Sequence, residues 1–207
     1  MSGTIELAPG MMLWPGRLDA DAQRQLLRDV LERVAQAPFY RPTMPRTGTP
    51  FSVEMTNFGP FGWVSDRNGY RYQKHHPVTD AQWPAMPELL LNLWGETTAY
   101  RAPPEACLVN LYRSDARMSL HQDMDEDAPD APVLSVSLGD NALYRFGGTT
   151  KRGGPTKSVK LESGDVLMFG GPARFIYHSV DRIQAGSSTL VPGGGRINLT
   201  LRRVTAA

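Results

Sequence analysis

The sequence has little cysteine, little histidine and almost no net charge, and each shortage excludes a class of protein. A single cysteine, Cys107, rules out an internal disulfide, which fits a reducing, cytoplasmic location. A formal net charge of +1 argues against a protein that coats nucleic acid indiscriminately, so any nucleic-acid contact must come from local patches. No run approaches 18 apolar residues, and the N-terminus lacks a charged region followed by an apolar one. We therefore expect neither a membrane span nor a signal peptide.

Two amphipathic helices are predicted in the first half of the chain. One covers residues 19–36 and ends before Pro38, and the other covers residues 87–100 with a proline in its first turn. Apolar residues recur on one side of each: Leu26, Leu27, Val30, Leu31 and Val34 in the first, and Leu89, Leu90, Leu93 and Trp94 in the second. We expect the helices to buttress a sheet.

Beyond residue 105 the chain changes to short alternating segments separated by Gly, Pro and Asp. Eight strands are predicted, in ACLVNLY, RMSLHQ, PVLSVSLG, ALYRFG, SVKLE, DVLMFG, RFIYHSV and RINLTLR. Many short strands after two helices indicate a mostly β fold of the α+β class, built as a two-sheet barrel or jelly roll. Cys107 lies in the first of these strands and is expected to be a buried thiol, since no activating base is apparent beside it.

The segment between the two helices is expected to form a small mobile hairpin. In SVEMTNFGPFGWVSDRNGYRY, short alternating runs are separated by Gly-Pro and Asn-Gly turn signals. It carries interleaved aromatic and basic residues: Phe51, Phe58, Phe61, Trp63, Tyr70 and Tyr72, with Arg67, Arg71 and Lys74. Such a hairpin suits nucleic acid, because rings stack on bases and cations meet phosphates. From this stretch alone, a small satellite core under a loop is an equal alternative.

The triplet His121-Gln122-Asp123 is the first candidate for chemistry. In an extended chain His121 and Asp123 lie on the same face, so that imidazole and carboxylate can bind one ion. Since His75 and His76 lie upstream in a polar, proline-flanked loop, His178 is the candidate third ligand. Two histidines and a carboxylate leave positions on Fe(II) open for a co-substrate and dioxygen, which suggests an oxygenase. Taken alone, the triplet fits a surface hydrogen-bonded pair better, with His178 as an ordinary half-buried strand histidine.

The last predicted strand, in GRINLTLRR, has one polar and one apolar face. Arg196, Asn198, Thr200 and Arg202 share the polar face, and Ile197, Leu199 and Leu201 share the other. The guanidinium fork matches a carboxylate in two parallel hydrogen bonds, so this face is suited to holding an anion. The order of the histidine and aspartate motif, the second histidine and the two arginines fits 2-oxoglutarate as co-substrate. Six strand residues span roughly 20 Å, so both arginines can reach it only from a strongly twisted strand.

Several separated blocks carry a resemblance to one family. They are SVEMTN with GW (52–63), WPAMP (83–87), NLYRSDARMSLHQDMDE (110–126), YRFGG (144–148) and RINLTLR. The chain resembles the AlkB family of Fe(II)- and 2-oxoglutarate-dependent dioxygenases, which repair alkylated nucleic acid bases. The resemblance implies one domain over residues 1–207, with a double-stranded β-helix (jelly roll) core at 105–203. A nucleotide-recognition hairpin lid at about 45–80 would cover it, and N-terminal helices would buttress it.

The resemblance also implies roles at the matching positions. Implied metal ligands are His121, Asp123 and His178, and implied 2-oxoglutarate contacts are Asn110, Tyr112, Arg196, Asn198 and Arg202. Implied substrate contacts are Trp63, Tyr70, Tyr72, Asp125 and Arg152. No catalytic residue is implied beyond the metal site.

Two of these substrate positions have a structural alternative. Asp125 would favour cationic bases through its charge, or it is one of the solvated acids in DMDEDAPD. Arg152 lies in the basic cluster with Lys151, Lys157 and Lys160, and such a run is usually a solvated loop. The chain departs from the best-known bacterial member here, with a slightly longer loop and with Met124 in place of a lysine. We expect these departures to affect strand and sequence preference rather than the reaction.

The activity implied by the resemblance is oxidative demethylation of 1-methyladenine and 3-methylcytosine. It uses Fe(II), dioxygen and 2-oxoglutarate, and releases formaldehyde, succinate and carbon dioxide. The expected substrate is alkylated DNA, single- or double-stranded, with RNA as a further class, and the protein is expected to be a cytoplasmic monomer. Two alternatives remain open: an enzyme of the same chemistry that modifies transfer RNA or other RNA, and a non-catalytic metal-dependent binding module.

Overall fold

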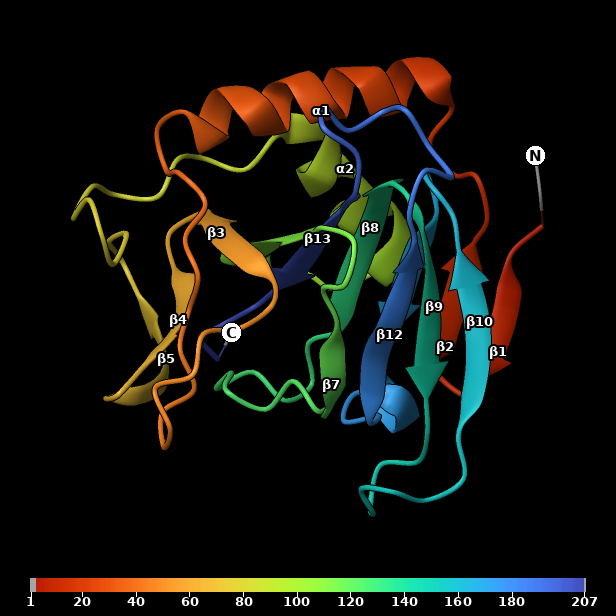
Figure 1. Ribbon diagram of the computed structural model, residues 1–207. Coiled ribbons are helices and arrows are strands. Elements are labelled where there is room, and N and C mark those ends of the chain that lie inside the picture. The colour runs from red at the N-terminus through yellow and green to blue at the C-terminus, as the bar shows by residue number, and fades with distance from the viewer. Residues whose placement is uncertain (1–2, 207) are drawn as a thin grey trace.

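Two antiparallel sheets form the framework of this computed structural model, which describes residues 3–206 (Figure 1). The larger sheet has the strand order β1 (Ile5–Ala8), β2 (Met11–Trp14), β11 (Val166–Phe169), β8 (Val133–Gly139), β13 (Arg196–Arg202), β6 (Ala106–Tyr112) and β3 (Glu54–Phe58). The smaller sheet has the order β10 (Lys157–Leu161), β9 (Asn141–Phe146), β12 (His178–Gln184) and β7 (Met118–His121). The predicted mostly β jelly roll of the α+β class is confirmed.

The polar and apolar faces of β13 point into different layers. Ile197, Leu199 and Leu201 pack in a core with apolar residues of the helices α1 (Ala20–Val34) and α2 (Glu88–Thr98). On the opposite face of the large sheet, a second core includes Leu108 and Phe169, packed with Tyr144 and other residues of the smaller sheet. The helices therefore cover the outer face of the large sheet, as Figure 1 shows, and the inner face is left for the site.

Both predicted helices form, with shorter ends than the sequence suggested. The carboxylate of Asp19 accepts a hydrogen bond from the Ala22 N–H at 2.8 Å and caps α1. α2 ends where Ala99 adopts φ +53°, a left-handed conformation that closes the helix. One position was wrong: Leu31 is 38% exposed, so it lies at the edge of the α1 apolar stripe. In the described residues no helix is long and apolar enough to cross a membrane.

All eight predicted strands of the second half form, but one is displaced. The segment RFIYHSV was expected to be a strand throughout, whereas β12 begins only at His178 and continues to Gln184. A 3-10 turn at Gly171–Ala173 precedes it, and the buried Arg174 side chain donates to carbonyl groups of Asp123 and Ala131 instead of facing a strand neighbour. The strands β1 and β2, the first two at one end of the large sheet, were not predicted. Each has only four residues and lies before the first helix, outside the run of predicted strands.

The predicted hairpin is divided between two sheets. β4 (Gly62–Asp66) and β5 (Gly69–Gln73) pair with each other through the Asn-Gly turn, as expected. The preceding EMTNF segment instead forms β3, which pairs along β6 at the edge of the large sheet. Met55 and Phe58 are fully buried there. The range expected for the lid, 45–80, therefore contains a framework strand, and only β4 and β5 stand apart from the two large sheets.

Candidate metal and co-substrate site

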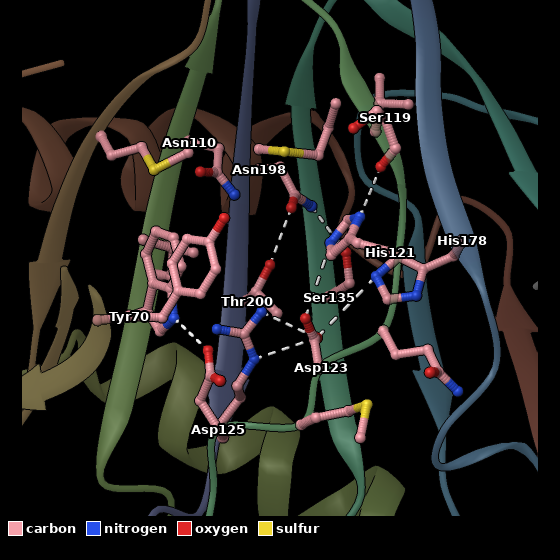
Figure 2. Close-up of a pocket in the computed structure, with 18 of the residues that line it drawn as sticks. Tyr70, Asn110, Ser119, His121, Asp123, Asp125, Ser135, His178, Asn198 and Thr200 are labelled. Atoms are coloured by element: carbon pink, nitrogen blue, oxygen red, sulfur yellow. Dashed lines mark hydrogen bonds and ion pairs between the residues drawn. The ribbon is translucent and has the colours of Figure 1, made fainter. Parts of the chain in front are cut away.

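Three predicted ligands converge between the two sheets. His121 ends β7, His178 begins β12, and the two are directly paired in register, while Asp123 follows in the loop after β7. Nε2 of His121 lies 3.8 Å from Oδ1 of Asp123, and Nε2 of His178 lies 4.0 Å from Oδ2. One ligand atom from each residue falls within 4.8 Å of the others, so the three side chains could hold a single metal ion. Figure 2 shows them pointing toward one another.

The second nitrogen of each imidazole is engaged by the backbone. Nδ1 of His121 lies 2.8 Å from the Ser119 carbonyl oxygen, and Nδ1 of His178 lies 3.0 Å from that of Ile176. A carbonyl oxygen only accepts, so each Nδ1 carries the hydrogen and donates it. The lone pair is then on Nε2, the atom that faces the cluster. This is how a metal-binding histidine is commonly oriented by its outer partner.

Burial and a neighbouring arginine keep His178 and Asp123 in the protonation states that bind a metal ion. Burial, helped by the neighbouring His121 ring, lowers the pKa of His178 to about 4, so the imidazole is neutral at physiological pH. Burial alone would raise the pKa of Asp123, but Arg202 and the two imidazoles hold it well below its usual range. A neutral imidazole and an ionised carboxylate are the forms that bind metal.

The triad opens into a cavity of about 350 Å³ between the sheets. Its wall includes the predicted residues Asn110, Tyr112, Asn198 and Arg202, and its mouth includes Trp63, Tyr70 and Asp125. The polar face of β13 forms a connected row: Thr200 Oγ1 donates to Asn198 Oδ1 at 2.9 Å, and Asn198 Nδ2 donates to Ser135 Oγ at 2.7 Å (Figure 2). The strand thus presents fixed polar groups to the cavity.

Arg196 and Arg202 lie at opposite ends of β13 and have different hydrogen-bond partners. Arg202 donates from Nε to Oδ2 of Asp123 at 3.1 Å, and its Nη2 lies 2.8 Å from the same oxygen, so it already has an anionic partner. Arg196 is 1% exposed and donates from Nη2 to Ser137 Oγ at 2.9 Å. Its Nε and Nη1 have no hydrogen-bond partner among the described residues. The two arginines of this face therefore lie in different surroundings, and of the two only Arg202 is among the residues that line the cavity.

The unpaired arginine provides a test of whether 2-oxoglutarate fits. Burial lowers the pKa of Arg196 to about 10, and the nearby carboxylate of Asp165 offsets only part of this effect. The hydroxyl of Tyr144 and Oδ1 of Asn110 are likewise buried and without a partner in the part of the chain that the structure describes. Tyr112 and Tyr144 line the cavity, and burial raises the pKa of both phenols, so both hydroxyls stay protonated. Buried polar groups without partners are rare; a carboxylate would accept hydrogen bonds from Arg196 and from the Tyr144 hydroxyl, whereas Asn110 Oδ1 needs a donor.

Aromatic residues form the mouth of the cavity. Trp63 stacks on Tyr70 with ring centroids 5.5 Å apart and an angle of 18° between planes. The Trp63 indole N–H donates to Oδ2 of Asp125 at 2.7 Å. Tyr70 is 47% exposed, which leaves one ring of the pair accessible. The mouth therefore offers flat stacking surfaces beside a carboxylate.

Two predicted substrate residues lie elsewhere. Tyr72 does not line the cavity in the described structure: its hydroxyl donates to Glu126 and accepts from Arg202. Arg152 is exposed in the loop between β9 and β10, also outside the cavity wall. That loop projects at the end of the smaller sheet in Figure 1.

Several cavity and network residues were missed by the sequence interpretation. Tyr144 lies on β9, where Ala142, Tyr144 and Phe146 alternate inward, so the period of two could have placed it on the inner face. Ser135 could have been found only by knowing that β8 lies beside β13. Glu126 and Arg174 form a buried ion pair at 2.9 Å, and no local pattern marks either as functional.

Comparisons with known proteins agree with this geometry. Residues 10–202 match the sequence model of the 2OG-Fe(II) oxygenase superfamily. The chain is 54% identical to "Alpha-ketoglutarate-dependent dioxygenase AlkB homolog" of Caulobacter vibrioides, over 98% of this chain and 91% of that one. It is 43% identical to "Alpha-ketoglutarate-dependent dioxygenase AlkB" of Escherichia coli K12, over 90% of this chain and 87% of that one. The solved structure of OsALKBH1 is similar with a TM-score of 0.82 and 32% identity, covering 97% of this chain and 100% of that chain.

Proposed function

The chain belongs to the 2OG-Fe(II) oxygenase superfamily, and on that premise we propose that it removes methyl groups oxidatively from alkylated bases of DNA. The enzyme is an Fe(II)- and 2-oxoglutarate-dependent dioxygenase. The proposed lesions are 1-methyladenine and 3-methylcytosine. Overall, the N-methyl group, dioxygen and 2-oxoglutarate become formaldehyde, succinate and carbon dioxide, and a hydrogen replaces the methyl group on the base nitrogen.

The proposed metal ligands are His121, Asp123 and His178. The two Nδ1 donors fix the rings, and Arg202 binds one oxygen of Asp123 and leaves Oδ1 free on the His121 side. Fe(II) and 2-oxoglutarate, when bound, would supply the oxidising chemistry that hydroxylates the methyl carbon. The residues need only hold these groups and the base in a dry cavity.

The proposed 2-oxoglutarate contacts use the polar face of β13 and the neighbouring β6. Arg196 would pair with one carboxylate of the co-substrate, because its Nε and Nη1 are buried and unpaired. Asn110, Tyr112 and Asn198 line the cavity, and Tyr112 pairs with Arg196 across β6 and β13; these three would contact the rest of the molecule. Arg202, which also lines the cavity, would contact the co-substrate near the triad and orient Asp123.

Base recognition is proposed for the mouth. Trp63 and Tyr70 offer stacking faces of the kind that sequence-tolerant nucleic-acid binding uses. A base inside a duplex must be flipped out to reach the triad, which costs least for a damaged or single-stranded base. Asp125, beside Trp63, would favour a cationic lesion over a neutral base. Arg152 would contact phosphate from the β9–β10 loop, outside the cavity.

The observation that carries the proposal is the single cavity that joins the triad to a stacked aromatic mouth. The test is mass spectrometry of a DNA strand with one 1-methyladenine, incubated with protein, Fe(II), 2-oxoglutarate and ascorbate. Loss of the methyl mass with formation of succinate, absent in His121→Ala, is the expected result. A matched RNA strand tests the RNA-directed alternative. Binding of the strand without consumption of 2-oxoglutarate would favour a binding module instead.

A further inference from the structure

Glu126 lies at the centre of a buried ionic network beside the triad. Its side chain is 1% exposed, and its Oε2 pairs with Nη2 of Arg174 at 2.9 Å. Its Oε1 accepts a hydrogen bond from the Tyr72 hydroxyl and lies 3.5 Å from Nε of Arg202. Asp123 and Glu126 thus share Arg202, and Glu126 also pairs with Arg174; the four side chains are at most 8% exposed, and all but Arg174 line the cavity. The charges balance, so removal of any one leaves another buried charge uncompensated.

Arg174 ties this network to the loop that carries the aspartate ligand. Its Nη1 donates to the backbone carbonyl of Asp123 at 2.7 Å, and its Nε donates to that of Ala131 at 2.7 Å. Glu126 therefore holds in place the arginine that fixes the backbone of Asp123. Through Arg202, which faces both carboxylates, it also affects the orientation of the Asp123 side chain.

The hairpin β4–β5 contacts the same loop at two consecutive residues. Trp63 and Tyr72 lie directly opposite each other in the hairpin. The Trp63 indole donates to Asp125, and the Tyr72 hydroxyl donates to Glu126. The first contact is at the exposed mouth, and the second enters the buried network. Burial raises the pKa of Tyr72 well above its ordinary value, so this hydroxyl stays protonated and remains a donor.

We propose that Glu126 is a positioning residue that, with Tyr72, couples the β4–β5 hairpin to the Asp123–Arg202 pair. Arg202 contacts both Asp123 and Glu126. How closely it approaches Glu126 depends on whether the Tyr72 hydroxyl of the hairpin also donates to that carboxylate. A hairpin displaced from the loop withdraws that hydroxyl, and Arg202 then moves toward Glu126 and away from the metal ligand. Conversely, loading the triad and the anion site holds the hairpin in place. The inference rests on the metal and co-substrate sites of the proposed function.

The experiment is hydrogen–deuterium exchange of the hairpin peptides, with and without Mn(II) and 2-oxoglutarate. Mn(II) binds mixed nitrogen and oxygen ligand sets as Fe(II) does, and saturation is verified by electron paramagnetic resonance. In the native protein, loading is expected to slow exchange over residues 62–73 by about fivefold or more, the lower end of typical coupling between sites. Tyr72→Phe, which keeps the ring, and Glu126→Gln, which keeps the shape, are expected to reduce this slowing to less than about twofold.

Tyr100→Phe is the matched control, because the Tyr100 hydroxyl also donates to a carboxylate of the same loop, Asp130, at 3.1 Å but outside the network. In this variant, Mn(II) and 2-oxoglutarate should slow hydrogen exchange of residues 62–73 as much as in the native protein. A variant that is only less stable would exchange hydrogen faster both with and without Mn(II) and 2-oxoglutarate. The slowing caused by these ligands would then be unchanged. The inference is overturned if ligands slow hydrogen exchange in Tyr72→Phe as much as in the native protein. It is also overturned if they cause no slowing in the native protein, or if Tyr100→Phe loses the slowing as Tyr72→Phe does. No nucleic acid is present, so these results are independent of whether the methylated strand is a substrate.

Discussion

Arg202 and Asp123 form a buried ion pair in which Nη2 and Nε of the arginine both face Oδ2 of the aspartate, at 2.8 and 3.1 Å. The other oxygen, Oδ1, is left on the side of His121. The arginine therefore holds the carboxylate in one orientation and keeps it ionised. Arg202 also lines the cavity, so a residue predicted to contact 2-oxoglutarate contacts the proposed metal ligand as well.

Replacement of a triad histidine is expected to abolish metal binding without unfolding the protein. The His121 side chain is 37% exposed, so His121→Ala removes little buried contact. Demethylation should fall by more than the roughly 10–100-fold that loss of an outer-shell partner costs. Titration with Mn(II), followed by electron paramagnetic resonance, checks the site directly. His75→Ala, an exposed histidine outside the cluster, is the control; equal binding by both variants would exclude His121 as a ligand.

Arg196→Met is expected to remove the response to 2-oxoglutarate while leaving the unliganded protein at least as stable. The substitution removes a buried guanidinium whose Nε and Nη1 lack partners, and an apolar side chain of similar length tolerates burial better. In thermal unfolding with Mn(II), 2-oxoglutarate at a hundred times its dissociation constant should stabilise the native protein by about 2.7 kcal/mol. The variant should show almost none of this shift.

Arg145→Met is the control for that measurement, because Arg145 pairs with Asp181 at 2.9 Å on a half-exposed surface. It should keep the full shift. A large loss of stability in unliganded Arg196→Met would contradict the view that Arg196 awaits an anion.

Asp125→Asn tests selection by charge. The amide keeps an oxygen acceptor for the Trp63 indole but removes the negative charge at the mouth. Activity on the cationic 1-methyladenine and 3-methylcytosine should fall about tenfold, and activity on the neutral 3-methylthymine by less than about threefold, since the lost attraction acts only on a charged base. The measurement is kcat/KM on matched oligonucleotides. Asp127→Asn, an exposed neighbour in the same loop, controls for general charge. Equal losses on all three lesions would remove charge selection.

Cys107 is expected to be inert in the folded protein. It is fully buried on β6, and burial raises the pKa of its thiol far above the usual value, so almost no thiolate is present. Ellman's reagent should show no reaction over an hour in native buffer and one thiol in guanidinium chloride. Rapid reaction in native buffer would mean that the large sheet opens locally.

The sequence by itself determined the fold class and the core of the site. The two faces of RINLTLR were readable from a period of two, and the structure places one against the helices and the other toward the cavity. The pairing of His121 with Asp123 followed from their spacing in an extended chain. These signals are local, because a strand or helix imposes its period on the residues within it.

Only the tertiary structure decided which partners the site residues contact. Strand order places β8 beside β13, and that brings Ser135 and Ser137 to the polar row. The same packing gives Arg202 an aspartate and leaves Nε and Nη1 of Arg196 without a partner among the described residues, although both arginines lie on one face of one strand. It also turns Tyr72 from the mouth toward Glu126, 54 residues away in sequence. Such contacts depend on strand order and loop path, which side-chain periodicity does not encode.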